Sequence, residues 1–132
     1  MTDESNHSDD RIFLVVVDES EEMHVALRFA CRRAEHTGGR VALLYVVEQA
    51  DFQHWMAVGD LMREEARSEG EQLLGLIEEE PSISILVLGA NTGRRGPGPL
   101  IEALTGRFLS KLAIPMTIVP GNLDDDSIDK IS

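Results

Sequence analysis

Continuous apolar runs are the feature that most constrains how this 132-residue chain can fold. The first, Ile12–Val17, reads IFLVVV, and the second, Val41–Val47, reads VALLYVV. Neither run alternates apolar with polar residues, which is typical of strands buried on both faces of a parallel sheet. Two further apolar runs, Ile83–Leu88 and Met116–Val119, follow later in the chain. The sequence therefore predicts an α/β domain with a mainly parallel sheet.

Helical patterns separate these runs. Segment 21–36 follows capping residues Asp18 and Ser20 and ends at Gly38-Gly39, as a helix would. Its expected core stripe is Met23, Leu27, Ala30, Cys31 and Ala34. A second helix is predicted over Leu100–Leu112. We expect one α/β domain over residues 11–120, with helices that cover both faces of the sheet. Residues 1–10 are expected to form a disordered acidic tail, and residues 121–132 an acidic C-terminal tail.

The middle of the chain does not fit this plan simply. From about Phe52 to Glu80 the pattern is helical and strongly charged. One helix of that length would span about 40 Å, against roughly 20 Å for a six-residue strand. It would overshoot the sheet, yet no strand-like run interrupts it. Trp55, near its start, is interpreted as a packing or dimer contact.

A glycine-rich loop follows the third apolar run. Two residues separate Gly93 from Gly96, and nine separate Gly96 from Gly106. A strand that leads into glycines and then a helix can hold phosphate through backbone N–H groups and the helix dipole. Arg94 and Arg95 lie inside this loop. The pattern indicates that this loop forms a binding site for a small anion. The alternative is that the two arginines are solvated loop residues and bind no ligand.

Charge limits the classes of partner. The net charge of −12 argues against nucleic acid and against an anionic membrane surface. Residues 89–114 are the exception, since they contain four Lys or Arg residues and one acidic residue, Glu102. The single cysteine, Cys31, excludes an intramolecular disulfide and favours a reducing, cytoplasmic location. We expect Cys31 to be a packing residue. No apolar run is long enough for a membrane span, and the N-terminus lacks a signal-peptide pattern.

Catalytic and metal motifs are absent from the sequence. The four histidines show no metal-ligand spacing, and neither CxxC nor HExxH occurs. The nucleophile elbow GxSxG is also missing. A receiver domain would need an aspartate after the third strand, where Gly89 stands.

These pieces, in this order, resemble the universal stress protein family. The matching sequences are VVVDESEE, LLYVVE, LVLGA, the GxxG-nine-G spacing and AIPMTIVP, which together extend over nearly all of residues 11–120. The resemblance implies a doubly wound, mainly parallel sheet with helices on both faces, in a Rossmann-like fold of the adenine-nucleotide α-hydrolase type. It further implies a dimeric stress-response regulator that binds ATP, with Mg²⁺, and hydrolyses it slowly or not at all.

The resemblance also implies site residues. Asp18 and Val46 resemble the residues that hold adenine and ribose. The glycine directly after the strand corresponds to Gly89, and the phosphate-binding glycines to Gly93, Gly96 and Gly106; Arg94, Arg95 and Arg107 would surround the phosphates. The chain departs from the family at Arg107, where a serine or threonine is usual, and in the glycine spacing after Gly89. Pro97 and Pro99 remove two N–H groups from the loop.

Family members have another strand and part of a helix near the position of Leu73–Leu76. Either this chain lacks the segment and has a four-stranded sheet, or residues are missing from the sequence there. The second explanation is favoured, because losing an edge strand would expose the apolar flank of Val41–Val47.

The leading hypothesis is a cytoplasmic, ATP-binding stress-response module that acts as a homodimer on an unknown protein partner. The runner-up is a dimeric interaction module of the same fold, whose diverged loop no longer binds nucleotide. An enzyme of the wider nucleotide-binding group is a third possibility. Dimerisation is predicted through the last strand, Met116–Val119, because its short apolar edge ends the sheet.

Overall fold

A computed structural model describes residues 11–18, 20–45 and 58–132 of the chain. The elements are β1 (Ile12–Val17), α2 (Glu21–Thr37), β2 (Arg40–Tyr45), α3 (Val58–Glu79), β3 (Ile83–Ala90), α4 (Pro99–Thr105), the 3₁₀ helix η2 (Leu109–Lys111), β4 (Met116–Pro120) and α5 (Asp125–Ile131). The tail 1–10, Val46 and Trp55, all of which carried predictions, lie outside the described residues.

The four strands form one parallel sheet in the order β2-β1-β3-β4. Leu14 of β1 lies opposite Ala42 on one side and Leu86 on the other. The central residues of β1, Phe13–Val16, are all at most 7% exposed. The parallel sheet that the apolar runs predicted is therefore confirmed, since a central parallel strand is covered on both faces.

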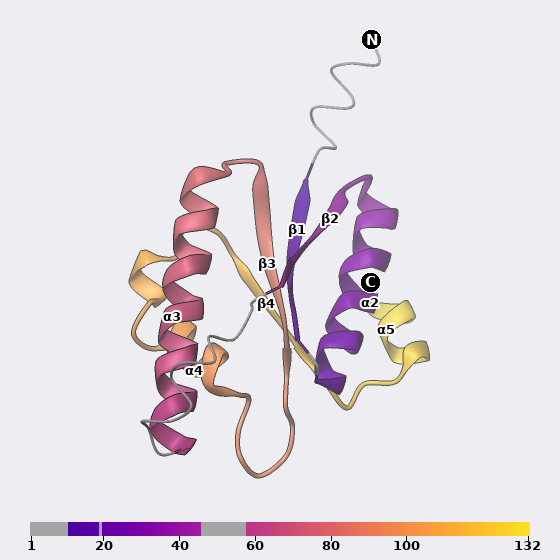
Figure 1. The fold of residues 1–132 in the computed structure, drawn as a ribbon. Helices are drawn as coiled ribbons and strands as arrows, with labels where there is room; N and C mark the ends of the chain where they lie inside the picture. Colours follow the sequence, from indigo (N-terminus) through magenta and orange to yellow (C-terminus); the bar gives the residue numbers. More distant parts are fainter. Residues whose placement is uncertain (1–10, 19, 46–57) are drawn as a thin grey trace.

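Helices cover both faces of the sheet (Figure 1). Phe13 and Val15 belong to a core cluster with α2 and α5, whereas Leu14 and Val16 belong to a second cluster with α3 and α4. This division follows from the strand, in which successive side chains point to opposite faces. The doubly wound arrangement is confirmed.

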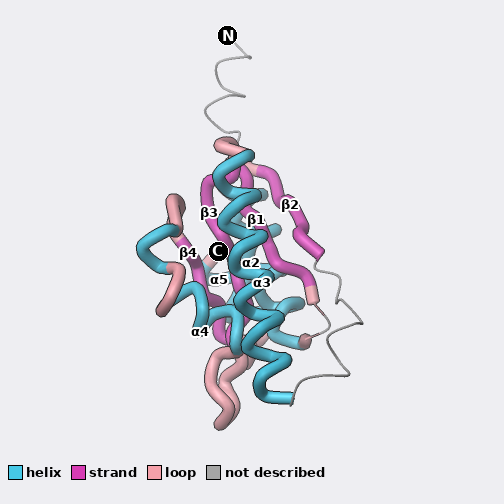
Figure 2. The backbone as a smooth tube through the Cα atoms, turned by 60° about the vertical axis from the view of Figure 1, so that its left-hand side comes forward, coloured by secondary structure: helices cyan, strands magenta, loops and turns pink. Residues whose placement is uncertain are grey.

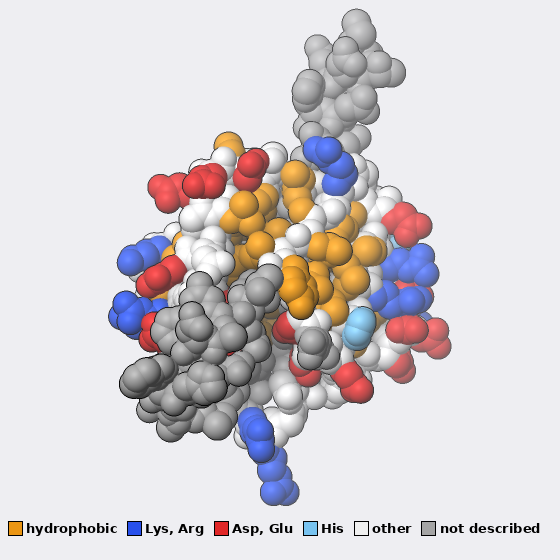
Figure 3. Space-filling model, viewed as in Figure 1, with side chains coloured by type: hydrophobic (Ala, Val, Ile, Leu, Met, Phe, Trp, Pro, Cys, Tyr) orange, Lys and Arg blue, Asp and Glu red, His pale blue; other side chains and the backbone are white. Residues whose placement is uncertain are grey.

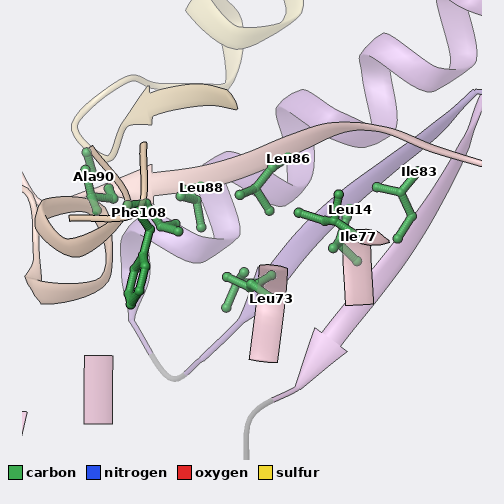
Figure 4. Close-up of a cluster of buried hydrophobic side chains, with 11 residues drawn as sticks. Leu14, Leu73, Ile77, Ile83, Leu86, Leu88, Ala90 and Phe108 are labelled. Atoms are coloured by element: carbon green, nitrogen blue, oxygen red, sulfur yellow. The ribbon is translucent and has the colours of Figure 1, made fainter. Parts of the chain in front are cut away.

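Helix α3 runs through Leu73–Leu76 without a break, and the sheet of the described residues has four strands. The favoured explanation for this region, missing residues, stays a prediction. The buried residues of α3, Ala66, Gly70, Leu73 and Ile77, recur at intervals of three or four, which keeps one face of the helix on the sheet. Strand β3 is eight residues long rather than six. The difference in length between α3 and β3 is therefore smaller than the sequence suggested. Figure 4 shows Leu73 and Ile77 in one buried cluster with Leu14, Leu86 and Phe108.

In the sheet that the described residues form, β2 lies at one edge and β4 at the opposite edge (Figure 2). Leu43 and Tyr45 of β2 are 58% and 63% exposed. The exposed apolar flank expected of a four-stranded sheet is present.

The region after α4 differs from the predicted single helix over Leu100–Leu112. Helix α4 ends at Gly106, and Leu109–Lys111 form the separate η2. The break lets Phe108, 3% exposed, reach the α3 side of the core. Gly70 accommodates this ring, since a Cβ there would lie 2.7 Å from a Phe108 ring carbon.

Residues 121–132, expected as an acidic tail, include α5. Asp124 caps it by accepting a 2.8 Å hydrogen bond from the Ser127 N–H. Ile128 is fully buried against α2, and Asp129 accepts two hydrogen bonds from Arg28, at 3.0 and 2.9 Å. This segment therefore belongs to the packed domain, because an apolar residue and ion pairs anchor it to α2.

Candidate ligand-binding site

The strand order places a topological switch point between β1 and β3. From β1 the chain turns to α2 and then to β2, whereas from β3 it turns to α4 on the other face and then to β4. The connections that follow β1 and β3 therefore separate at the carboxyl ends of these strands. Open α/β sheets bind ligands in the crevice formed there.

A cavity of about 310 Å³ lies at this point. Five elements contribute to it: the ends of β1 and β3, the first turn of α2, the middle of α3, and the start of α4. Its lining consists of Val16, Asp18, Ser20, Glu22, Met23, Glu65, Ala66, Glu69, Leu88, Gly89, Asn91, Pro97, Gly98, Pro99, Leu100 and Ile101. The volume is near the lower end of the range for small-molecule sites, about 300–1,000 Å³.

Asp18 is among the residues that line the cavity, and its carboxylate also orders the start of α2. It accepts a 2.8 Å hydrogen bond from the Ser20 N–H and a second from the Ser20 hydroxyl. Ser20 in turn accepts from the Met23 N–H at 3.3 Å and is the N-cap of α2. The turn between β1 and α2 thus fixes one wall of the cavity.

Gly89 lines the cavity too, but the structure gives it a packing role. A Cβ at this position would lie 2.1 Å from the carbonyl oxygen of Glu22. Glycine therefore lets the first turn of α2 approach β3 closely. Gly121, which the sequence reasoning did not single out, meets the same turn: a Cβ there would lie 2.5 Å from the Cβ of Glu22.

The loop glycines Gly93 and Gly96 do not line the cavity. The Gly93 N–H donates to the side chain of Asn91 at 2.6 Å, and the Gly96 N–H donates to the carbonyl of Gly93 at 3.3 Å. Gly96 has a φ of +86°, a left-handed conformation that favours glycine. These hydrogen bonds join residues within the loop. They occupy two of the N–H groups that were expected to bind phosphate.

The arginines of the loop lie away from the cavity. Arg94 and Arg95 are exposed. Figure 3 shows Lys and Arg side chains at the lower tip of the molecule, where the loop between β3 and α4 lies in Figure 1. Gly106 and Arg107 follow the C-terminal end of α4, whereas the cavity uses its N-terminal residues, Pro99–Ile101. The structure does not bring the expected phosphate-binding residues together.

The lining contains four carboxylates and no positive side chain. All twelve Lys and Arg residues of the chain belong to the part that the structure describes, and none of them lines the cavity. The apolar residues and Asp18 suit a nucleoside, but a triphosphate would have no cationic side chain among the lining residues. The residues present therefore do not fit ATP as a whole. Within the described residues, no three His, Cys, Asp or Glu side chains are placed to hold a metal ion.

The fold and the cavity define a doubly wound α/β protein with a ligand site at the switch point of its sheet. The model of the universal stress protein family matches residues 11–81, which is more than half of the 132-residue chain. The chain belongs to the universal stress protein family. The matched range contains β1, α2, β2 and α3 and ends before the glycine loop.

The other comparisons add no relative. Neither the curated proteins nor the solved structures include a significant match. Over the described residues, no helix combines the length and apolar character needed to span a bilayer.

Proposed function

We propose that this chain is a small-molecule-binding module of the universal stress family, which reports its ligand state to a partner protein or to a second copy. The observation that supports this is the cavity at the switch point, to which both faces of the sheet contribute. In its leading form the proposal excludes a triphosphate ligand, because Gly93, Gly96 and the arginines of the loop do not line the cavity. The diverged loop would then be a surface element.

ATP with Mg²⁺ is the second candidate. The position of Asp18 and Gly89 on the cavity favours it, as does the family to which the chain belongs. In this form the nucleoside would occupy the apolar part of the cavity, and the Gly93–Arg107 segment would have to rearrange around the phosphates.

The first experiment tests whether the protein binds a small molecule. Small molecules released from freshly purified protein are identified by mass spectrometry, and the emptied protein is titrated calorimetrically with adenosine, AMP and ATP·Mg²⁺. A recovered or titrated ligand supports the module. Tight binding of ATP supports the second candidate, an ATP·Mg²⁺ site. If adenosine binds and ATP does not, the result supports the first candidate, a site that excludes a triphosphate.

A cavity variant then locates the site. Ala66 is 5% exposed and lines the cavity, so Ala66→Leu would fill part of it. The matched control is Ser68→Leu, at an exposed position of the same helix that does not line the cavity. We expect at least a tenfold loss of affinity in Ala66→Leu and none in the control. Equal affinity in the two variants would contradict the assignment of the cavity as the site.

Dimerisation is part of the same proposal. Among the described strands, β4 pairs only with β3, and Ile118 of β4 is 40% exposed. Two copies could pair these edges about a twofold axis and continue the sheet. The cytoplasm, where thiols stay reduced, is the proposed location because the chain has one cysteine.

A further inference from the structure

Helix α5 is a short element that packs against α2 (Figure 1). Its buried residue is Ile128, whereas Ile131 is 60% exposed. Asp129 adds ion pairs with Arg28, at 2.9 Å, and with Arg32, at 3.1 Å. These three side chains are between 35% and 39% exposed, and ion pairs at that exposure contribute little stability. A seven-residue helix held in this way is expected to open locally before the whole domain unfolds.

Helix α2 contacts the C-terminal segment at two places. The first is the connection from β4 to α5, where a Cβ on Gly121 would lie 2.5 Å from the Cβ of Glu22. The N–H of Gly121 also donates to the carbonyl of Ala90 at 2.8 Å, which ties this connection to the end of β3. The second place is Arg28, six residues further along α2 and so about 9 Å away. One rigid helix therefore touches both the connection and α5 itself.

The first turn of α2 is also a wall of the cavity. Ser20, Glu22 and Met23 line it. Gly89, which lines the cavity from β3, and Gly121 both leave room for the backbone or side chain of Glu22. The turn thus lies between the cavity, the sheet and the connection to α5. In a close-packed interior it cannot shift without changing at least one of these contacts.

We propose that α5 is a conformational device that responds to the cavity. A ligand that packs against the first turn of α2 fixes that turn and stabilises the docked position of α5, whereas an empty cavity lets α5 open more often. Opening would expose Ile128 and part of the core cluster to which it belongs. This inference rests on the proposed function and names the element through which the same site reports its ligand state. Coupling of this kind is reciprocal, so docking of α5 also favours the ligand.

Hydrogen exchange on the full chain tests the coupling without a ligand. Ser20→Ala removes the N-cap of α2, and the control Thr37→Ala removes a hydroxyl from the last residue of the same helix. The readout is the exchange of the Ile128 and Ser132 amides, which donate to carbonyls of the α5 segment. We expect exchange to be roughly three- to fivefold faster in Ser20→Ala and little changed in the control. Equal rates in the two variants overturn the proposal.

The amides of Phe13–Val16 in β1 are the reference for unfolding of the whole domain, since this strand is central and buried. We expect the α5 amides to exchange faster than these in the wild type, and to accelerate more than these in Ser20→Ala. Equal acceleration of both sets would show that the variant acts only on global stability, and it would overturn the proposal.

A second measurement works from α5 towards the cavity. Asp129→Asn weakens the docking of α5, and the control Asp126→Asn changes an exposed carboxylate of the same helix. Adenosine is titrated calorimetrically into the wild type and both variants. Where the wild type binds adenosine, we expect at least about a threefold loss of affinity in Asp129→Asn and none in the control. Saturating adenosine should also slow exchange of the α5 amides. Equal affinities in the three proteins overturn the proposal.

The outcomes distinguish this inference from the proposed function. If adenosine or ATP·Mg²⁺ binds and Ala66→Leu abolishes that binding, but α5 exchanges equally fast in Ser20→Ala and Thr37→Ala, the cavity remains the ligand site and only this inference fails. If no probe binds and the purified protein releases no small molecule, the proposed function fails, and the inference that rests on it fails as well.

Discussion

At the residue scale, Gly89 controls how closely α2 approaches the sheet. We predict that Gly89→Ala lowers the free energy of unfolding by about 1–3 kcal/mol, because its Cβ would overlap the Glu22 carbonyl and force the helix outward. The control is Gly75→Ala, at a helix position with no atom within 4 Å of the added Cβ. That change should raise the free energy by about 0.5–1 kcal/mol. Urea unfolding followed by circular dichroism measures both, and changes of the same sign would contradict the close approach.

Cys31 was expected in the core but is exposed. The apolar stripe of α2 follows Met23, Ala26, Ala30 and Ala34 instead, which turns Cys31 away from the sheet. We predict that the native protein reacts with a thiol reagent such as DTNB at a rate within tenfold of that of the urea-unfolded protein. Reaction only upon unfolding would place the thiol in the interior.

At the element scale, α5 depends on an ion pair with α2. The Arg28 guanidinium, which donates to Asp129, holds the pKa of that carboxyl below its ordinary value. A lowered pKa in the folded state stabilises the protein above the unfolded-state pKa, and this stability is lost as the pH falls through the folded-state pKa. We predict that Asp129→Asn lowers the urea midpoint at pH 7 and flattens its decline from about pH 5 to pH 3.

The control for this prediction is Asp126→Asn on the same helix. Asp126 is exposed, and its charge acts on Arg28 only at longer range. Its substitution should change both the midpoint and the pH profile less. Identical pH profiles for the wild type and Asp129→Asn would show that the contact with Arg28 does not stabilise the fold.

At the scale of the whole molecule, the proposed dimer depends on the edge strands of the four-stranded sheet that the described residues form. Ile118→Lys would place a charge on the proposed β4 interface, and we predict that it converts a dimer into a monomer. Leu43→Lys makes the equivalent change on the opposite edge, β2, and should leave the dimer intact. Multi-angle light scattering reads the mass directly. Unchanged mass in Ile118→Lys would exclude β4 as the interface.

Much of the fold could be predicted because its signals are local. Apolar runs such as Ile12–Val17 mark buried strands, and Gly38 ends α2 in a left-handed conformation, with a φ of 79°. The length of α3 could not be predicted in this way. Its continuity depends on contacts with the sheet and with Phe108, which lies far away in the sequence.

The candidate site was predictable only in part. Asp18 comes directly after β1, Gly89 is the second-last residue of β3, and both line the cavity. The positions of Gly93, Gly96 and Gly106 could not be inferred, because spacing along the chain does not say which end of α4 faces the switch point.

The sequence by itself determined the family, the parallel sheet and the helices on its two faces, since each depends on local pattern. The tertiary structure decided which charges meet. Two glutamates of α3 converge with Asp18 and Glu22 around an apolar floor, while the arginines of the glycine loop lie outside the cavity. The physical reason is that a binding site depends on the distances between elements, and packing sets those distances.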